Sequence, residues 1–129
     1  MNTKEFRAEL TKIMPGYKWT VAKPYRLFEE SKTAPGFALM KAEGVQSSGF
    51  NRMSTLEVIR RVKENGAVEY EASIAGYGIR SDWVQTESAT TLARALRCVQ
   101  DRCEEKARLY STCAATMERA RAQKGEQTT

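Results

Sequence analysis

The fold is decided by residues 55–75, which read TLEVIRRVKENGAVEYEASIA. Apolar and polar side chains alternate on both sides of the central Asn65-Gly66, as they do in the two arms of a β-hairpin. The apolar faces of the two arms carry Leu56, Val58 and Val62, and Val68, Tyr70, Ala72 and Ile74. Two half-buried antiparallel strands joined by a tight turn are therefore predicted.

The turn determines which residues of the two arms face each other. A two-residue Asn65-Gly66 loop sets apolar positions opposite polar ones. A three-residue loop over residues 64–66 sets apolar positions opposite apolar ones and polar opposite polar. The longer loop needs Gly66 in a left-handed conformation, which glycine adopts without steric cost. Its register sets Arg61 opposite Glu69 and pairs Val62 with Val68, Val58 with Ala72 and Leu56 with Ile74. We expect the three-residue turn.

The segments before the hairpin predict one helix and two strands. An amphipathic helix is expected over residues 3–14, because its apolar residues recur at helical spacing; it begins at an Asn2–Glu5 capping pair and ends at Pro15-Gly16. Residues 17–21 alternate as a strand does. A connection around Pro24 and Pro35 follows, with one helical turn at residues 25–30. A second strand is expected over residues 37–45.

A long helix is expected after the hairpin, beginning near Thr86 or Ser88 and covering about residues 87–122. Its apolar positions follow alternating steps of four and three, with Lys106 as an interruption: Leu92, Leu96, Val99, Cys103, Tyr110, Cys113 and Met117. Such a helix is roughly 50 Å long, against about 30 Å for a small domain. Either it breaks around residues 104–106, or its second half needs a partner, most simply a second copy of the chain in a homodimer. Residues 124–129 are expected to be frayed.

These elements together predict a single α+β domain over residues 1–123. Their order is α-β-β-β-β-α, with an N-terminal helix and the long C-terminal helix packed on one face of an antiparallel sheet.

Composition limits the classes of function. The 129 residues carry a net charge of +5, and the basic excess is spread along the chain, which is compatible with nucleic-acid binding but does not argue for it. No apolar run approaches the roughly 20 residues that span a bilayer, and no signal-peptide pattern follows Met1. A cytoplasmic protein without a membrane partner is expected.

The residue types also argue against catalysis. The chain contains no histidine, which removes the commonest general base and most catalytic zinc sites. Cys98, Cys103 and Cys113 point in different directions around one helix and are expected to be buried or half-buried thiols. The adjacent pair Glu104-Glu105 diverges by about 100° on a helix and so forms no catalytic dyad. We therefore predict neither a cofactor, nor a metal, nor an enzyme.

Two glycine loops are the candidate contact site. Residues 49–52 read GFNR and residues 76–80 read GYGIR, so each loop joins flexible backbone to one aromatic residue and one arginine. The hairpin brings both loops to the same end of the sheet. Aromatic residues and arginines dominate binding hot spots and also stack on nucleic-acid bases. The predicted binding residues are Phe50, Asn51, Arg52, Tyr77, Arg80 and Trp83. In the alternative, Phe50 and Trp83 fold inward and close the end of the sheet.

Three segments resemble a small family carried by bacterial phages and plasmids: MPGYKWTV at residues 14–21, SSGFNR at residues 47–52 and TLARAL at residues 91–96. The resemblance covers about residues 1–103. It implies an accessory protein of a mobile element, of the kind that blocks host defences without catalysis, as anti-CRISPR proteins do by binding effector complexes.

Two hypotheses of function follow. In the first, the chain is a counter-defence inhibitor that binds a host protein or ribonucleoprotein complex. In the second, it binds single-stranded nucleic acid directly through the aromatic loops. Salt separates the two, because nucleic-acid affinity falls steeply with ionic strength and a mainly apolar protein interface changes little.

Overall fold

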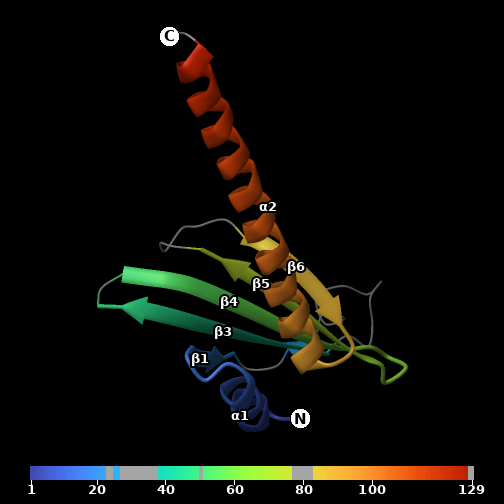
Figure 1. The fold of residues 1–129 in the computed structure, drawn as a ribbon. Helices are drawn as coiled ribbons and strands as arrows, with labels where there is room; N and C mark the ends of the chain where they lie inside the picture. The colour runs from blue at the N-terminus through green and yellow to red at the C-terminus, as the bar shows by residue number, and fades with distance from the viewer. Residues whose placement is uncertain (23–24, 27–37, 50, 77–82, 128–129) are drawn as a thin grey trace. The chain divides into compact units, whose positions relative to one another are not determined.

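The computed structural model describes residues 1–22, 25–26, 38–49, 51–76 and 83–127, and it has the predicted α+β class (Figure 1). An N-terminal helix, an antiparallel sheet and a long C-terminal helix follow one another as expected. The elements are α1 (Thr3–Ile13), β1 (Lys18–Val21), β2 (Tyr25–Arg26), β3 (Ala38–Ser48), β4 (Asn51–Val62), β5 (Val68–Ala75), β6 (Trp83–Ala89) and α2 (Leu92–Gln127). The chain divides into two compact units, residues 1–99 and residues 100–129.

The helix α1 begins with the predicted capping box. The backbone N–H of Glu5 donates to the Asn2 side chain at 2.8 Å, and the Asn2 N–H donates to the Glu5 carboxylate at 3.4 Å. Two of the helix's otherwise unpaired N–H groups are thereby satisfied. Phe6 and Leu10 are fully buried, and the helix ends before Pro15, as the sequence predicts.

The sheet has the strand order β1-β3-β4-β5-β6, with β2 paired to β3. The central hairpin is formed by β4 and β5, and its register is the predicted one: Val62 faces Val68, Val58 faces Ala72 and Leu56 faces Ile74. In the turn, the Gly66 N–H donates to the Lys63 carbonyl at 2.9 Å, and Gly66 has a φ of 86°. The three-residue loop with a left-handed glycine is confirmed.

Gly66→Val should therefore lower the free energy of unfolding by about 1 kcal/mol or more, because a β-branched side chain resists positive φ. Urea denaturation measures the change. Gly16→Val is the matched control, since a Cβ at Gly16 meets no atom within 4 Å and its φ is not positive. Equal losses in the two variants would contradict the strained-turn explanation.

The core lies between one face of the sheet and the two helices. Strand residues on this inner face, including Leu56, Val58 and Ala72, are buried, and the Tyr70 ring lies 6.4 Å from the Phe6 ring of α1. The first turns of α2 add Leu92, Leu96 and Val99, each at most 6% exposed. The opposite side of the sheet, called the outer face below, carries the alternate residues of the strands.

The structure differs from the sequence prediction around the start of the long helix. Residues 86–89, expected in that helix, belong to the strand β6, and α2 begins only at Leu92. The Ser73 and Thr86 hydroxyl oxygens lie 2.8 Å apart across β5 and β6, a long-range contact that favours the strand. The helix runs without a break through residues 104–106 and continues to Gln127, past the expected end at residue 122 and into the segment expected to be frayed.

The connection between β1 and β3 also differs from the sequence prediction. Tyr25–Arg26, expected to begin a helical turn, form the short strand β2, which pairs with Leu39 and Ala38. Residues 27–30 of that expected turn lie outside the described residues. The prediction was wrong for Tyr25–Arg26 because the pairing partner is distant in the sequence.

Candidate contact surface

The strand ends that lead into the two predicted loops lie at the same end of the sheet. The β3–β4 connection includes Gly49, which has a φ of 61°, and the β5–β6 connection follows Gly76. Because β4 is antiparallel to both of its neighbours, Gly49 and Gly76 lie at the end of the sheet opposite the Gly66 turn (Figure 1). Of the predicted binding residues, Phe50, Tyr77 and Arg80 lie outside the described residues. Asn51, Arg52 and Trp83 stand at the starts of β4 and β6.

A β-bulge places Arg52 on the outer face. Gln46 pairs with Ser54 and Ser47 pairs with Arg52, so Met53 is an extra residue in β4. An extra residue reverses the alternation of side chains along the strand. Arg52 consequently approaches Glu43 of β3, with 3.8 Å between Nη1 and Oε1, and 30% of its side chain is exposed.

Trp83 also lies on the outer face, at the edge of the sheet. It faces Ala75, which faces Thr55 of β4. Both neighbours are small and buried, whereas Trp83 is 47% exposed. The alternative in which Trp83 folds into the core is therefore wrong. A half-exposed tryptophan next to small neighbours is an anchor that a partner protein can cover.

Eight charged residues of the outer face form four ion pairs, and Lys18 of β1 is a further exposed cation on this face. Three of these pairs join neighbouring strands and the fourth joins the residue after β4 to β5, with N···O distances between 2.7 and 3.8 Å: Lys41–Glu57, Arg52–Glu43, Arg61–Glu71 and Lys63–Glu69. The register sets Arg61 opposite Glu69 as predicted, but its guanidinium binds the diagonal neighbour Glu71. Exposed pairs of this kind add little stability. Their effect here is to leave these four cations and four carboxylates without a net charge.

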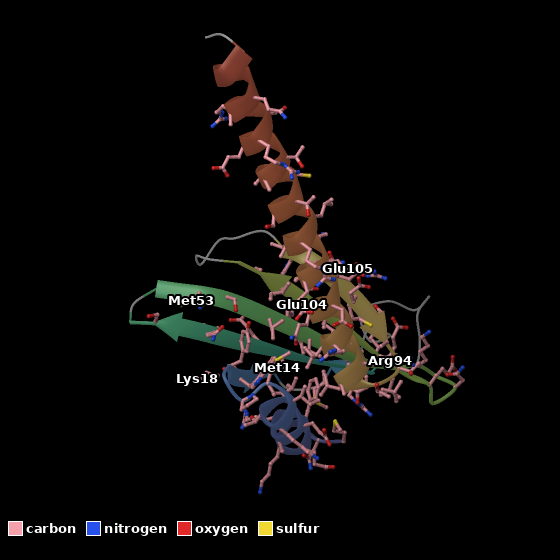
Figure 2. All side chains as sticks on the ribbon, in the orientation of Figure 1. Met14, Lys18, Met53, Arg94, Glu104 and Glu105 are labelled. Atoms are coloured by element: carbon pink, nitrogen blue, oxygen red, sulfur yellow. The ribbon has the colours of Figure 1, made fainter. Side chains whose placement is uncertain are left out.

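Sequence reasoning missed Met53 as a surface residue. It is 47% exposed on β4, near the end that carries the β3–β4 connection (Figure 2). The sequence pattern could have indicated this. Leu56 and Val58 show that the even-numbered residues of β4 face the core, so the odd-numbered Met53 is expected on the opposite face. An apolar residue at such a position is expected at the surface.

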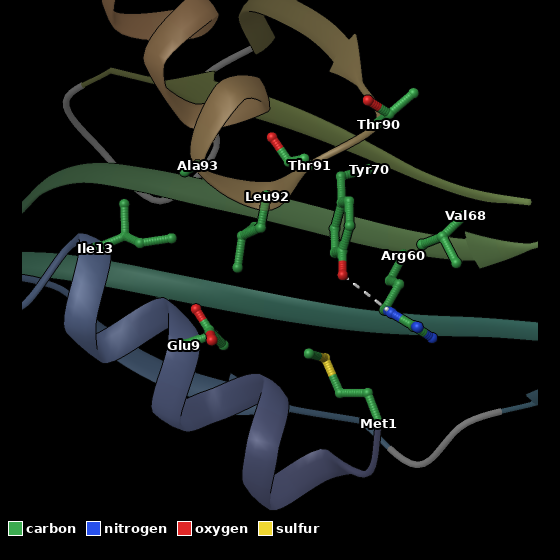
Figure 3. A pocket seen from close by; sticks show the side chains of 10 residues that line it. All are labelled: Met1, Glu9, Ile13, Arg60, Val68, Tyr70, Thr90, Thr91, Leu92 and Ala93. Carbon is green, nitrogen blue, oxygen red and sulfur yellow. Dashed lines mark hydrogen bonds between the residues drawn. The ribbon is translucent and has the colours of Figure 1, made fainter.

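The cavity in Figure 3 lies on the other side of the sheet. It has a volume of about 340 Å³ and is bounded by α1, the inner face and the start of α2. Its mouth carries Glu9 of α1 and Arg60 of β4, and the Arg60 Nε–H donates to the Tyr70 hydroxyl at 3.1 Å. Ile13, Val68 and Leu92 supply apolar walls. None of the cavity's residues was predicted to bind a ligand.

Two further observations concern chemistry and membranes. Over the described residues, no three His, Cys, Asp or Glu side chains gather closely enough to hold a metal ion. Glu104 and Glu105 bind different neighbours, Gln100 at 3.1 Å and Arg102 at 2.9 Å, so their carboxylates act separately.

Neither α1 nor α2, over its described length, is apolar enough to cross a membrane.

The comparisons with known proteins give no further guide. No family model, no curated protein and no solved structure matches the chain.

Proposed function

We propose that this protein is a non-enzymatic binding protein whose contact surface is the loop-bearing end of the outer face. The observation that carries the proposal is the exposure of Trp83 on a face that carries four ion pairs. Met53 and Arg52 lie at the same end of the sheet and extend the surface. A large aromatic anchor with an arginine, surrounded by neutralised polar groups, is the composition of a protein–protein hot spot.

The paired charges favour a protein partner over single-stranded nucleic acid. A groove for single strands combines stacking aromatics with cations that are free to contact phosphates. On this face Lys41 and Arg61 each already contact a glutamate. Phosphate binding would have to displace those carboxylates, which reduces the gain from counterion release.

The resemblance to accessory proteins of mobile elements suggests the class of partner. In this proposal the chain is a counter-defence inhibitor, active in the bacterial cytoplasm, and its target is a host protein or a nucleic-acid-guided effector complex. Binding without catalysis is sufficient for such a role, because covering a functional surface of the effector blocks it. Phage plaquing on a strain with active CRISPR–Cas interference should rise when the chain is expressed, and a Trp83→Ala variant should fail to restore plaques.

Affinity capture tests the proposal directly. Tagged wild-type protein, Trp83→Ala and Arg7→Ala are immobilised and exposed to a lysate of the phage's host, with and without nuclease. Arg7 is an exposed residue of α1, which packs on the other side of the sheet, so its variant is the control. We expect one host protein or complex to be retained by the wild type and by Arg7→Ala in both lysates, and lost with Trp83→Ala.

The nucleic-acid alternative has its own readout. A fluorescent 20-nucleotide oligo(dT) should show no saturable binding to the purified chain at micromolar concentration and 150 mM salt. Tight binding that weakens steeply between 50 and 200 mM salt would instead establish the alternative, since that slope reports released counterions.

A further inference from the structure

The C-terminal part of α2 presents an uncharged band to solvent. No charged residue occurs in the segment Leu109–Met117, and Leu109, Tyr110 and Met117 are 59%, 68% and 64% exposed. Helices in proteins gain most of their stability by packing an apolar face rather than from intrinsic propensity. Exposed large side chains in such number on one helix indicate a contact surface.

Tyr110 and Met117 continue a stripe that is buried earlier in the same helix, and Leu109 flanks it. The steps of four and three that link Leu92, Leu96 and Val99 in the core lead on through positions 103, 106, 110, 113, 117 and 120. This spacing is the heptad pattern that brings one helix against another. Within residues 103–120 its only charged member is Lys106.

We propose that a second copy of this chain packs antiparallel against this stripe, with Tyr110 of each copy opposite Cys113 of the other. The charges favour this direction. In a parallel pair, Lys106 would face Lys106 of the second copy at the centre of the interface. In the antiparallel pair it lies opposite Met117, one residue from Glu118, where its ammonium group can meet a carboxylate.

Side-chain size favours the same direction. The antiparallel pair sets Tyr110 against the smaller Cys113, Met117 against Lys106 of similar length, and Cys103 against Ala120, so the central tyrosine faces a small side chain. A parallel pair would instead stack tyrosine on tyrosine and alanine on alanine. The flanking positions 107, 109, 114 and 116 carry Ala, Leu, Ala and Thr. No flanking charge there selects a different helix as partner. The interface uses none of the residues of the contact surface, so the two proposals can fail separately.

Sedimentation of the full chain tests the association. Between 5 and 200 μM the protein should pass from monomer to dimer, with a Kd on the order of 10 μM, as befits a short two-helix interface. Met117→Glu should be monomeric throughout. Ala115→Glu makes the same charge change on the opposite side of the helix and should dimerise as the wild type does. Lys106→Leu should tighten the dimer at least tenfold.

Disulfide trapping tests the direction. One variant keeps Cys103 as its only cysteine (Cys98→Ser and Cys113→Ser), and a second also carries Cys103→Ser with Ala120→Cys. When the two are mixed and oxidised, position 103 of one should bond to position 120 of the other, because only close Cα atoms can be bridged. Disulfides that form only between two molecules of the same variant would overturn the antiparallel arrangement. A wild-type monomer at 200 μM, or an undiminished Met117→Glu dimer, would overturn the interface itself.

Discussion

Gly44→Val is expected to lower the free energy of unfolding by about 3 kcal/mol, although valine is the better strand former. Gly44 of β3 faces Trp19 of β1, and the indole ring lies directly over it. A Cβ at Gly44 would come within 2.8 Å of Trp19 Cε3 and Cζ3. The ring is 7% exposed, and its Nε1–H donates to the Met14 carbonyl at 3.1 Å, so it has little room to move. Urea denaturation measures the loss.

A double-mutant cycle separates the ring contact from other effects at this position. In a Trp19→Leu background, Gly44→Val should cost at least 1 kcal/mol less than in the wild type, because the smaller side chain leaves space for the added methyl groups. If Gly44→Val costs the same in both backgrounds, the loss arises from the strand backbone and not from the indole.

The hairpin was predictable because two independent constraints agree. Alternation assigns a face to each residue of β4 and β5, and only the three-residue turn with Gly66 brings the two apolar faces together. The cap of α1 was predictable for a similar reason, since Asn2 and Glu5 satisfy each other's backbone over a few residues. Local patterns with reciprocal partners identify structure from sequence alone.

The features that sequence reasoning missed depend on distant partners. The strand β6 contains Thr86 and Ser88, which resemble helix caps, and it is a strand because β5 pairs with it. The bulge at Met53 arises from the pairing of β3 with β4 and has no local signature. The contact between Trp19 and Gly44 joins residues 25 positions apart. Tertiary pairing overrides local preference at each of these places.

The candidate site also has one part that could be predicted from the sequence and one part that could not. The shared end of the two glycine loops followed from strand order, because successive antiparallel hairpins alternate their ends. Arg52 is partly exposed, as predicted, and Trp83, for which an exposed and an inward position were both considered, is half exposed. The pairing of Arg52 with Glu43 could not be predicted, since the bulge determines which face Arg52 occupies. The clustering of Phe50, Tyr77 and Arg80 stays a prediction.

Trp83→Ala should weaken binding of the captured partner about thirtyfold, or about 2 kcal/mol, which is the cost of truncating an aromatic hot-spot residue. Trp83 is half exposed in the free protein, so covering it removes further apolar surface from water. Arg52→Ala should weaken binding about tenfold. Its guanidinium lies 3.8 Å from Glu43, a loose pair that can turn its remaining donors toward a partner. Calorimetric titration with the purified partner measures both effects.

The fold itself should survive these changes. Trp83 lies on an edge strand and Arg52 makes an exposed ion pair, so we expect the melting temperature to fall by only a few degrees. Arg7→Ala, on α1, should bind as the wild type does. A folded Trp83→Ala variant with unchanged affinity would place the working surface elsewhere. The ion pairs of the outer face would then be a structural consequence of strand pairing, and the uncharged band of α2 would become the leading candidate for the working surface.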